Sequence, residues 1–252
     1  MAENTILYPS LEQTSELADS IIRRLLKNLY IQDGLVAWWD GEWNAGLGVH
    51  DSNATVWKDL VGPYTMTASA QTDTWNATCL TMGTTTWKIT PKTQFVRLLN
   101  SPQRVNESYS VEMVLSHTDQ SNKCIFGHRY ITLDIHAYHA YEAVWLKNGT
   151  DVYVGAASGG KHSISLSGAR SGSTANELIR WHYNGGHTQS ATRAYTQAAD
   201  SDNFNVGVGF GQYPERGIAT ANIYCIRLYN RALTDAEVAF NYATDKRRFN
   251  LP

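Results

Sequence analysis

Residues 222–245 read Asn-Ile-Tyr-Cys-Ile-Arg-Leu-Tyr-Asn-Arg-Ala-Leu-Thr-Asp-Ala-Glu-Val-Ala-Phe-Asn-Tyr-Ala-Thr-Asp, and this stretch specifies a strand followed at once by a helix. Apart from Cys225 and Arg227, residues 223–229 are β-branched, aromatic or aliphatic, which is the composition of a half-buried strand. Tyr224, Ile226 and Leu228 share one side at a period of two. We therefore predict a strand with this side in a core.

The helix that follows has an explicit start signal. Thr234 and Glu237 have the spacing of a capping box, in which each side chain bonds the backbone amide of the other residue. Leu233 and Val238 occupy the two positions of a hydrophobic staple. The sequence therefore predicts a short helix that starts at Thr234.

This C-terminal stretch, together with Asp-Gly-Leu-Val-Ala-Trp-Trp-Asp-Gly at 33–41 and Thr-Val-Trp-Lys-Asp-Leu at 55–60, resembles laminin-G-like, concanavalin-A-like jelly-roll modules of bacterial and phage proteins. The resemblance runs from residue 33 to residue 246, with its motifs at the two ends. It implies an all-β fold, an antiparallel two-sheet jelly-roll sandwich in which an early strand pairs with the final strand. The residues that match the family's closing motif are Arg227, Tyr229, Asn230, Arg231, Leu233, Thr234 and Glu237.

The middle of the chain supports the same architecture. Residues 109–117 alternate apolar and polar side chains, as a strand with one inward face does. Asn148-Gly149 and Asn184-Gly185-Gly186 each lie between strand-like runs and predict hairpins, because both central residues must adopt positive φ. We also expect strands at 57–60, 77–80, 85–90 and 95–98, and no helix between Ile31 and Thr234.

Charge and hydropathy exclude two classes of partner. The formal net charge is −2, so no basic field attracts nucleic acid. No apolar run is long enough for membrane insertion, and the first ten residues lack the pattern of a secretory signal. Three cysteines without metal-site spacing, Cys79, Cys124 and Cys225, predict buried free thiols.

The N-terminal segment predicts an amphipathic helix. In residues 11–30 the acidic residues come first and the basic residues last, and one side carries a broad apolar stripe. The stripe consists of Leu17, Ile21, Ile22, Leu25, Leu26 and Leu29. It predicts either packing on the same domain or self-association. We therefore divide the chain into an anchoring or oligomerisation arm, residues 1–30, and a sandwich, residues 31–252, and expect a homo-oligomer, with a trimer favoured.

Catalysis of glycan hydrolysis requires two carboxylates at a fixed separation, which alternate residues of one strand can supply. No strand-like run carries such a pair, and Glu112 and Glu142 stand without acidic neighbours at i+2 or i+4. The sequence therefore predicts that the chain is not an enzyme. A divergent glycan hydrolase, with carboxylates from separate strands, stays as the alternative.

The loop after the first strand combines acids, an amide and glycines. Asp40, Asn44 and Asp51 offer the hard oxygen ligands that calcium prefers, so this loop is a candidate calcium site. No other cofactor is expected. The alternative is a solvated tight loop, which uses the same residue types.

Glycan binding requires an aromatic platform beside polar hydrogen-bonding groups. The candidate residues are Trp43, His50, Trp145, Trp181 and Tyr183. The alternative for the tryptophans is a place in the core of the sandwich.

The expected function follows from fold and compartment together. Lectin-like sandwiches mostly act outside cells, whereas this chain has no signal pattern and keeps free thiols. A phage virion protein, made in the host cytoplasm, reconciles the two, so we expect a decoration, fibre or appendage component that contacts other virion proteins and cell-surface glycan. A bacterial carbohydrate-binding module is the alternative.

Overall fold

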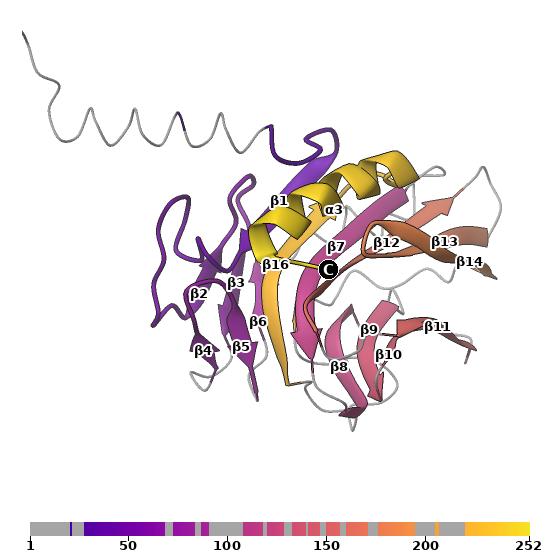
Figure 1. Cartoon of the computed structure of the whole chain (residues 1–252), viewed down its shortest axis with the longest axis horizontal. Coiled ribbons are helices and arrows are strands. Elements are labelled where there is room, and N and C mark those ends of the chain that lie inside the picture. The colour runs from indigo at the N-terminus through magenta and orange to yellow at the C-terminus, as the bar shows by residue number, and fades with distance from the viewer. Residues whose placement is uncertain are drawn as a thin grey trace, which may run out of the picture.

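The computed structural model describes residues 21, 28–68, 73–83, 87–90, 108–117, 120–128, 133–139, 141–146, 150–156, 160–170, 176–194, 205–206 and 220–252. These residues form two antiparallel β-sheets and the helix α3 (Asp235–Phe249). Figure 1 shows α3 lying across β7 and β16 of one sheet. The predicted all-β sandwich with a C-terminal helix is therefore confirmed.

The first sheet runs in the order β14-β13-β12-β7-β16-β5-β4, and β1 also pairs with β16. Its strands are β1 (Leu35–Asp40), β4 (Thr74–Trp75), β5 (Leu80–Met82), β7 (Ser108–His117), β12 (His162–Arg170), β13 (Asn176–Tyr183), β14 (Gly186–Ala194) and β16 (Ala221–Tyr229). The early strand β1 and the final strand β16 are antiparallel neighbours, with Trp38 opposite Arg227.

The second sheet runs in the order β11-β10-β9-β8-β15-β6-β3-β2. Its strands are β2 (Val56–Lys58), β3 (Thr65–Ala68), β6 (Trp87–Thr90), β8 (Gln120–His128), β9 (Leu133–His139), β10 (Tyr141–Leu146), β11 (Thr150–Ala156) and β15 (Asn205–Val206). The predicted strand at 95–98 lies outside the described residues.

Both predicted hairpins join neighbouring strands. β13 and β14 meet at Asn184 and Gly185, whose φ angles of 46° and 77° are both positive, as this two-residue turn requires. β10 and β11 are antiparallel partners, and the predicted turn between them lies outside the described residues.

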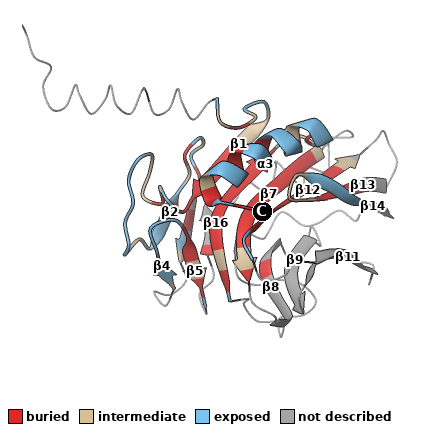
Figure 2. Cartoon of the chain, in the orientation of Figure 1, coloured by how far each residue is buried: buried red, intermediate tan, exposed pale blue. Residues whose placement is uncertain are grey.

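The main core lies between the two sheets. Among the described side chains, five tryptophans are buried in it: Trp39, Trp57, Trp75, Trp87 and Trp181. From β7 the core receives Tyr109, Val111, Met113 and Leu115, the alternating set that the sequence indicates. Figure 2 shows β7 and β16 in the colour of buried residues over most of their length.

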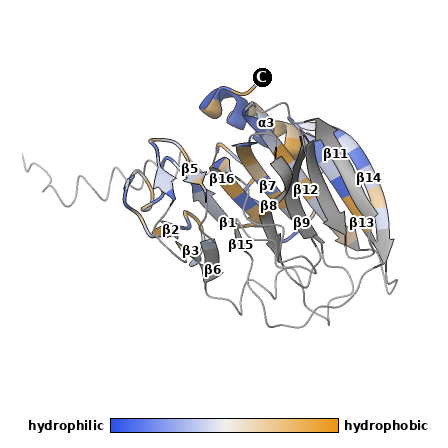
Figure 3. Ribbon diagram, turned by 90° about the horizontal axis from the view of Figure 1, so that it is seen from below, coloured by the Kyte–Doolittle hydropathy of each residue, from blue (hydrophilic) through white to orange (hydrophobic). Residues whose placement is uncertain are grey.

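The outer face of the first sheet is also covered. Tyr224, Cys225 and Phe249 form one cluster between the sheet and α3, and Tyr229, Leu233 and Val238 form another. Figure 3, seen from below, places α3 on the side of β7 that faces away from β8 and β9. Both faces of β16 are therefore buried, which a one-sided strand pattern does not indicate.

The predicted inward side of the final strand is wrong at one residue. Ile226 and Leu228 enter the core between the sheets, but Tyr224 packs under α3 beside Cys225. The register between β16 and β7 shifts between Ile223 and Cys225. Such a bulge places two successive side chains on the same face, so the period of two fails there.

The start of α3 agrees with the sequence. Thr234 is the N-cap, its hydroxyl accepts from the Glu237 amide, and the Glu237 carboxylate accepts from the Thr234 amide. The helix has 15 residues, so it is longer than the short helix expected. Among the described residues, no helix has the length and apolar composition needed to cross a membrane.

Candidate functional site

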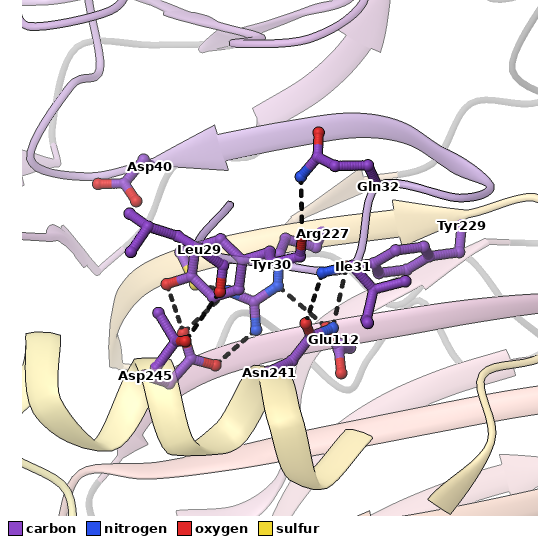
Figure 4. Close-up of polar contacts among 12 residues, drawn as sticks. Leu29, Tyr30, Ile31, Gln32, Asp40, Glu112, Arg227, Tyr229, Asn241 and Asp245 are labelled. Atoms are coloured by element: carbon purple, nitrogen blue, oxygen red, sulfur yellow. Dashed lines mark hydrogen bonds and ion pairs between the residues drawn. The ribbon is translucent and has the colours of Figure 1, made fainter. Parts of the chain in front are cut away.

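A buried cluster of charges joins β7, β16 and α3. The Arg227 guanidinium donates from Nε to Glu112 Oε2 at 3.0 Å and from Nη1 to Asp245 Oδ1 at 2.8 Å. Its Nη2 donates to the second oxygen of Asp245. All three side chains are at most 3% exposed. Figure 4 shows Arg227 between the two carboxylates.

Burial and charge oppose each other in this cluster. Burial alone lowers the pKa of Arg227, but the nearby negative groups, led by Asp245, raise it well above its usual value. Burial raises the pKa of Glu112, while Arg227 acts against that rise. Asn241 Nδ2 donates to the same Glu112 oxygen at 2.8 Å, so the carboxylate has two donors. The buried charged groups of the cluster are therefore bound by one another and by Asn241.

Tyr30 continues the cluster toward the surface. Its hydroxyl donates to Asp245 Oδ1 at 2.8 Å, and its ring centre lies 4.0 Å from Cζ of Arg227, a cation-π distance. Arg248 Nη1 donates to the Tyr30 hydroxyl at 2.9 Å and to Asp40 Oδ2 at 2.8 Å. A continuous chain of polar contacts thus runs from Glu112 on β7 to Asp40 at the end of β1.

Arg248 brings this chain to the surface at the loop of residues 41–51. Its Nη2 donates to Glu42 Oε2 at 3.3 Å, and its Cζ lies 4.9 Å from the ring centre of Trp43. Burial alone lowers the pKa of Arg248, but Asp40 and Tyr30 raise it above its usual value. The guanidinium therefore stays charged while it braces two successive loop residues.

The loop is held by its own backbone and by Asn44. The buried Asn44 amide donates to Asp51 O and accepts from Asp51 N, both at 2.8 Å, as a paired peptide group would. Further backbone bonds join Ala45 to Val49 and Asn44 to Lys58. A loop with this many bonds presents its outer side chains on a fixed frame.

The outer side of the loop carries an aromatic ring with polar groups beside it. Trp43 is half-buried and packs edge-on to Trp38 at 6.2 Å between ring centres. His50 is exposed, with Nδ1 3.2 Å from the Gly41 carbonyl oxygen, two residues before Trp43. The Glu42 side chain is 47% exposed. We take this outer side, Glu42, Trp43 and His50, as the candidate site and call it the loop site.

The five residues predicted for glycan binding do not meet at one place. Trp43 and His50 belong to the loop site, but Trp181 on β13 is 1% exposed and fills the core. Tyr183 is partly buried against that core and stacks on His162 at 5.4 Å. Trp145 lies on β10, in the other sheet, where side chains fall outside the described part of the chain.

The three predicted calcium ligands have other bonds. Asp40 is fully buried, and its two oxygens accept from Arg248 and from the Glu42 amide. The Asn44 oxygen accepts from the Asp51 amide, and Asp51 Oδ1 accepts from the Asn53 amide. Within the described ranges no group of three His, Cys, Asp or Glu side chains could hold a metal ion. In the structure these three residues bind groups of the loop, of the turn that follows it and of Arg248, and a calcium site here stays a prediction.

Most of the predicted anchoring stripe lies outside the described residues, namely Leu17, Ile22, Leu25 and Leu26. Ile21 is 50% exposed. Leu29 packs with Tyr30, Trp38 and Leu60, so its side chain is used by the sandwich.

A second polar group, without a counterpart in the sequence-based predictions, lies at the start of α3. His182 Nε2 lies 2.8 Å from Asp235 Oδ1, and Arg180 donates to the same carboxylate. Burial lowers the pKa of His182, and the bond with His182 lowers the pKa of Asp235. The sequence does not indicate Arg248 or Tyr30 either, because one of three successive basic residues in a last helical turn and a tyrosine before a strand carry no distinctive pattern.

Comparison with known proteins finds solved structures of similar fold but no related sequence. The sequence matches no family model and no curated protein. Among solved structures it is similar to Trypanosoma rangeli sialidase, with a TM-score of 0.61 at 12% identity over 93% of this chain and 39% of the sialidase. A complex of that enzyme with the inhibitor DANA gives 0.61 at 14% identity, over 92% and 37%. A complex with sialic acid gives 0.59 at 14%, over 84% and 33%.

The chain thus spans less than two fifths of the length of these sialidases. At such low identity the likeness is one of fold. It corrects the expectation that the chain is not an enzyme, because solved structures that share the fold are enzymes. The lack of a strand with paired carboxylates cannot separate the chain from them, since catalytic groups can come from separate strands. The resemblance to laminin-G-like modules rests on its motifs alone.

Proposed function

We propose that the chain is a glycan-recognising β-sandwich whose binding surface is the loop site. The observation that carries the proposal is the half-buried Trp43 ring, braced by Arg248, in the loop whose exposed His50 is held at the Gly41 carbonyl. A sugar ring packs its C–H face on such an aromatic surface, while its hydroxyls bond nearby polar groups. Glu42 supplies a hydrogen-bond acceptor, and His50 supplies a ring nitrogen that either donates or accepts a hydrogen bond.

The frame of the loop supports this assignment. Asn44 holds the loop closed and Arg248 ties it to α3 and β1, so few groups need to be ordered when a ligand binds. Such preorganisation lowers the entropic cost of binding. The likeness of fold to a sialidase seen with sialic acid supports glycans as the ligand class.

Charge favours neutral glycans over acidic ones. Glu42 and Asp51 expose carboxylates at the loop, whereas the Arg248 side chain is only 15% exposed and already faces Asp40 and Glu42. A sugar carboxylate would meet these negative groups, and the Arg248 guanidinium beside Trp43 is already paired with two carboxylates. The expected ligand is a neutral oligosaccharide with several free hydroxyl groups.

A glycan array that contains neutral and sialylated oligosaccharides tests the proposal on the full chain. We expect binding to neutral members, and loss of this binding in Trp43→Ala. Each binding glycan is then incubated with the protein and assayed for released sugar, which separates recognition from hydrolysis. Absence of binding to every glycan, or a preference for sialylated members, contradicts the proposal.

We further propose that the module acts on a phage virion, as an adhesion or decoration component. Cys79 and Cys225 are buried free thiols, which fits synthesis in a reducing compartment. Cys124 lies on β8, where its side chain falls outside the description. Mass spectrometry of purified virions should detect the chain in a fixed ratio to the capsid protein, and its absence from them contradicts this placement.

A further inference from the structure

The side of α3 that faces away from the sheet is an apolar stripe. Ala236, Ala239, Phe240 and Ala243 are all exposed, and Phe240 is 48% exposed. Residues three and four apart lie on one side of a helix, so these four are contiguous. Figure 2 shows much of the visible surface of α3 in the colour of exposed residues. Small side chains around one aromatic ring let a second helix approach closely.

We propose that this stripe binds residues 11–27 of a second copy of the chain. The sequence of that segment predicts an amphipathic helix whose apolar side includes Leu17, Ile21 and Leu25. Ile21 is 50% exposed, so in its own copy this apolar side chain is half uncovered. A helix of that length alone is marginal in water and gains stability from a partner surface.

The lengths of the two elements match. At 1.5 Å per residue, the 17 residues of the segment would extend about 25 Å and the 15 residues of α3 about 22 Å. One arm can therefore cover the whole stripe.

Charge indicates that the arm comes from another copy. α3 has Asp235 and Glu237 in its first turn and Lys246 and Arg247 in its last turns. The arm has the same polarity, with acidic residues at 12, 16 and 19 and basic residues at 23, 24 and 27. Opposite charges therefore meet only when arm and α3 are antiparallel, an arrangement that helix dipoles also favour.

Within one copy, the attachment of the arm at Leu29 forces the arm to run parallel to α3. Thr244 Oγ1 donates to the Leu29 carbonyl at 2.8 Å, which fixes the base of the arm beside the last turns of α3. An arm laid back over its own α3 would be parallel to it, with like charges adjacent at both ends. The arm of a second copy has no such tether. Because the arm and the stripe are unlike surfaces, copies related by a closed rotation form a ring, and a trimer is one such ring.

Complementation between two full-length variants tests this contact. Phe240→Glu places a charge on the stripe and Leu25→Glu places one on the arm. Analytical ultracentrifugation should show an oligomer for the unmodified chain and monomers for each variant alone. In an equimolar mixture, the intact arm of one variant meets the intact stripe of the other, so a heterodimer held by this single contact should appear, while the ring stays open. Val61→Glu, at a 45% exposed apolar residue outside α3, is the matched control and should stay oligomeric.

Three results would overturn the proposal. The first is an unmodified chain that is monomeric at all concentrations, and the second is either variant sedimenting like the unmodified chain. The third is a mixture that stays monomeric although circular dichroism shows both variants folded, because the arm of a second copy is then not the occupant.

Discussion

Arg227 of β16 and Asp245 of α3 form a two-point ion pair that is completely buried. The pair binds the C-terminal helix to the centre of the first sheet, together with the bond from Asn241 to Glu112 and the apolar clusters under α3. From it, bonds continue through Tyr30 and Arg248 to the loop site. The position of the candidate binding surface therefore depends on a charge cluster under α3.

Removal of one partner of this pair should destabilise the protein strongly. Asp245→Asn leaves the Arg227 guanidinium buried with a reduced negative environment, a change that typically costs about 3–5 kcal/mol. The free energy of unfolding from urea titration measures it. Arg180→Gln breaks the partly exposed pair with Asp235 and should cost less than about 1 kcal/mol. Equal losses of stability in the two variants would show that the buried pair contributes no more to stability than the partly exposed pair.

Loss of the capping box should lower the free energy of unfolding less than loss of the buried ion pair. Thr234→Ala removes the acceptor of the Glu237 amide and should lower the free energy of unfolding by about 1 kcal/mol. Thr234→Ser keeps the hydroxyl and should retain most of that energy. A urea midpoint that is the same in Thr234→Ala and in the unmodified protein would exclude a role for the cap.

Glu237 should make stability depend on acid pH. The bond with Arg231 lowers its pKa to about 2 from an ordinary value of 4.5. A lowered folded-state pKa stabilises the fold above pH 4.5, and this contribution is lost as the pH falls from there to about 2. Glu237→Gln should therefore lose less stability than the unmodified protein between neutral pH and about pH 2. Identical pH profiles would mean that the pair with Arg231 does not form in solution.

Substitution of Gly41 should destabilise the protein because there is no room for a side chain. An alanine Cβ there would lie 2.6 Å from the Thr78 carbonyl oxygen and 2.7 Å from Cα of Cys79, both backbone atoms. Gly41→Ala should cost about 1–3 kcal/mol, as overpacking does. At Gly83 the nearest atom is 3.9 Å away, so Gly83→Ala is the control and should be close to neutral. A neutral Gly41→Ala would show that β1 and the segment at Cys79 are less closely packed.

The sequence predicts local structure well where the signals are local. The capping box, the Asn184-Gly185 turn and the alternation in β7 depend on residues a few positions apart, and each is found. The prediction for Tyr224 is wrong because a bulge depends on the pairing with β7, which the strand's own residues do not encode.

The candidate site was only partly predictable for the same reason. Trp43 and His50 lie in one short loop, and His50 contacts the backbone of Gly41, two residues before Trp43, so proximity in sequence is enough to place both residues in the site. Trp181 has the same chemistry, but its side of β13 faces the second sheet. Arg248 supports the loop from 206 residues away in sequence from Glu42, a relationship that only the folded chain reveals.

Isothermal titration calorimetry with a neutral oligosaccharide identified on the array tests the central claim most directly. Trp43→Ala should weaken binding about tenfold or more, equal to about 1.4 kcal/mol, because the aromatic surface is lost. Trp43→Phe should retain part of the affinity, and His187→Ala, an exposed histidine on β14, should retain all of it. A Trp43→Ala protein that keeps its urea midpoint and binds the glycan with unchanged affinity would contradict the assignment of the loop site.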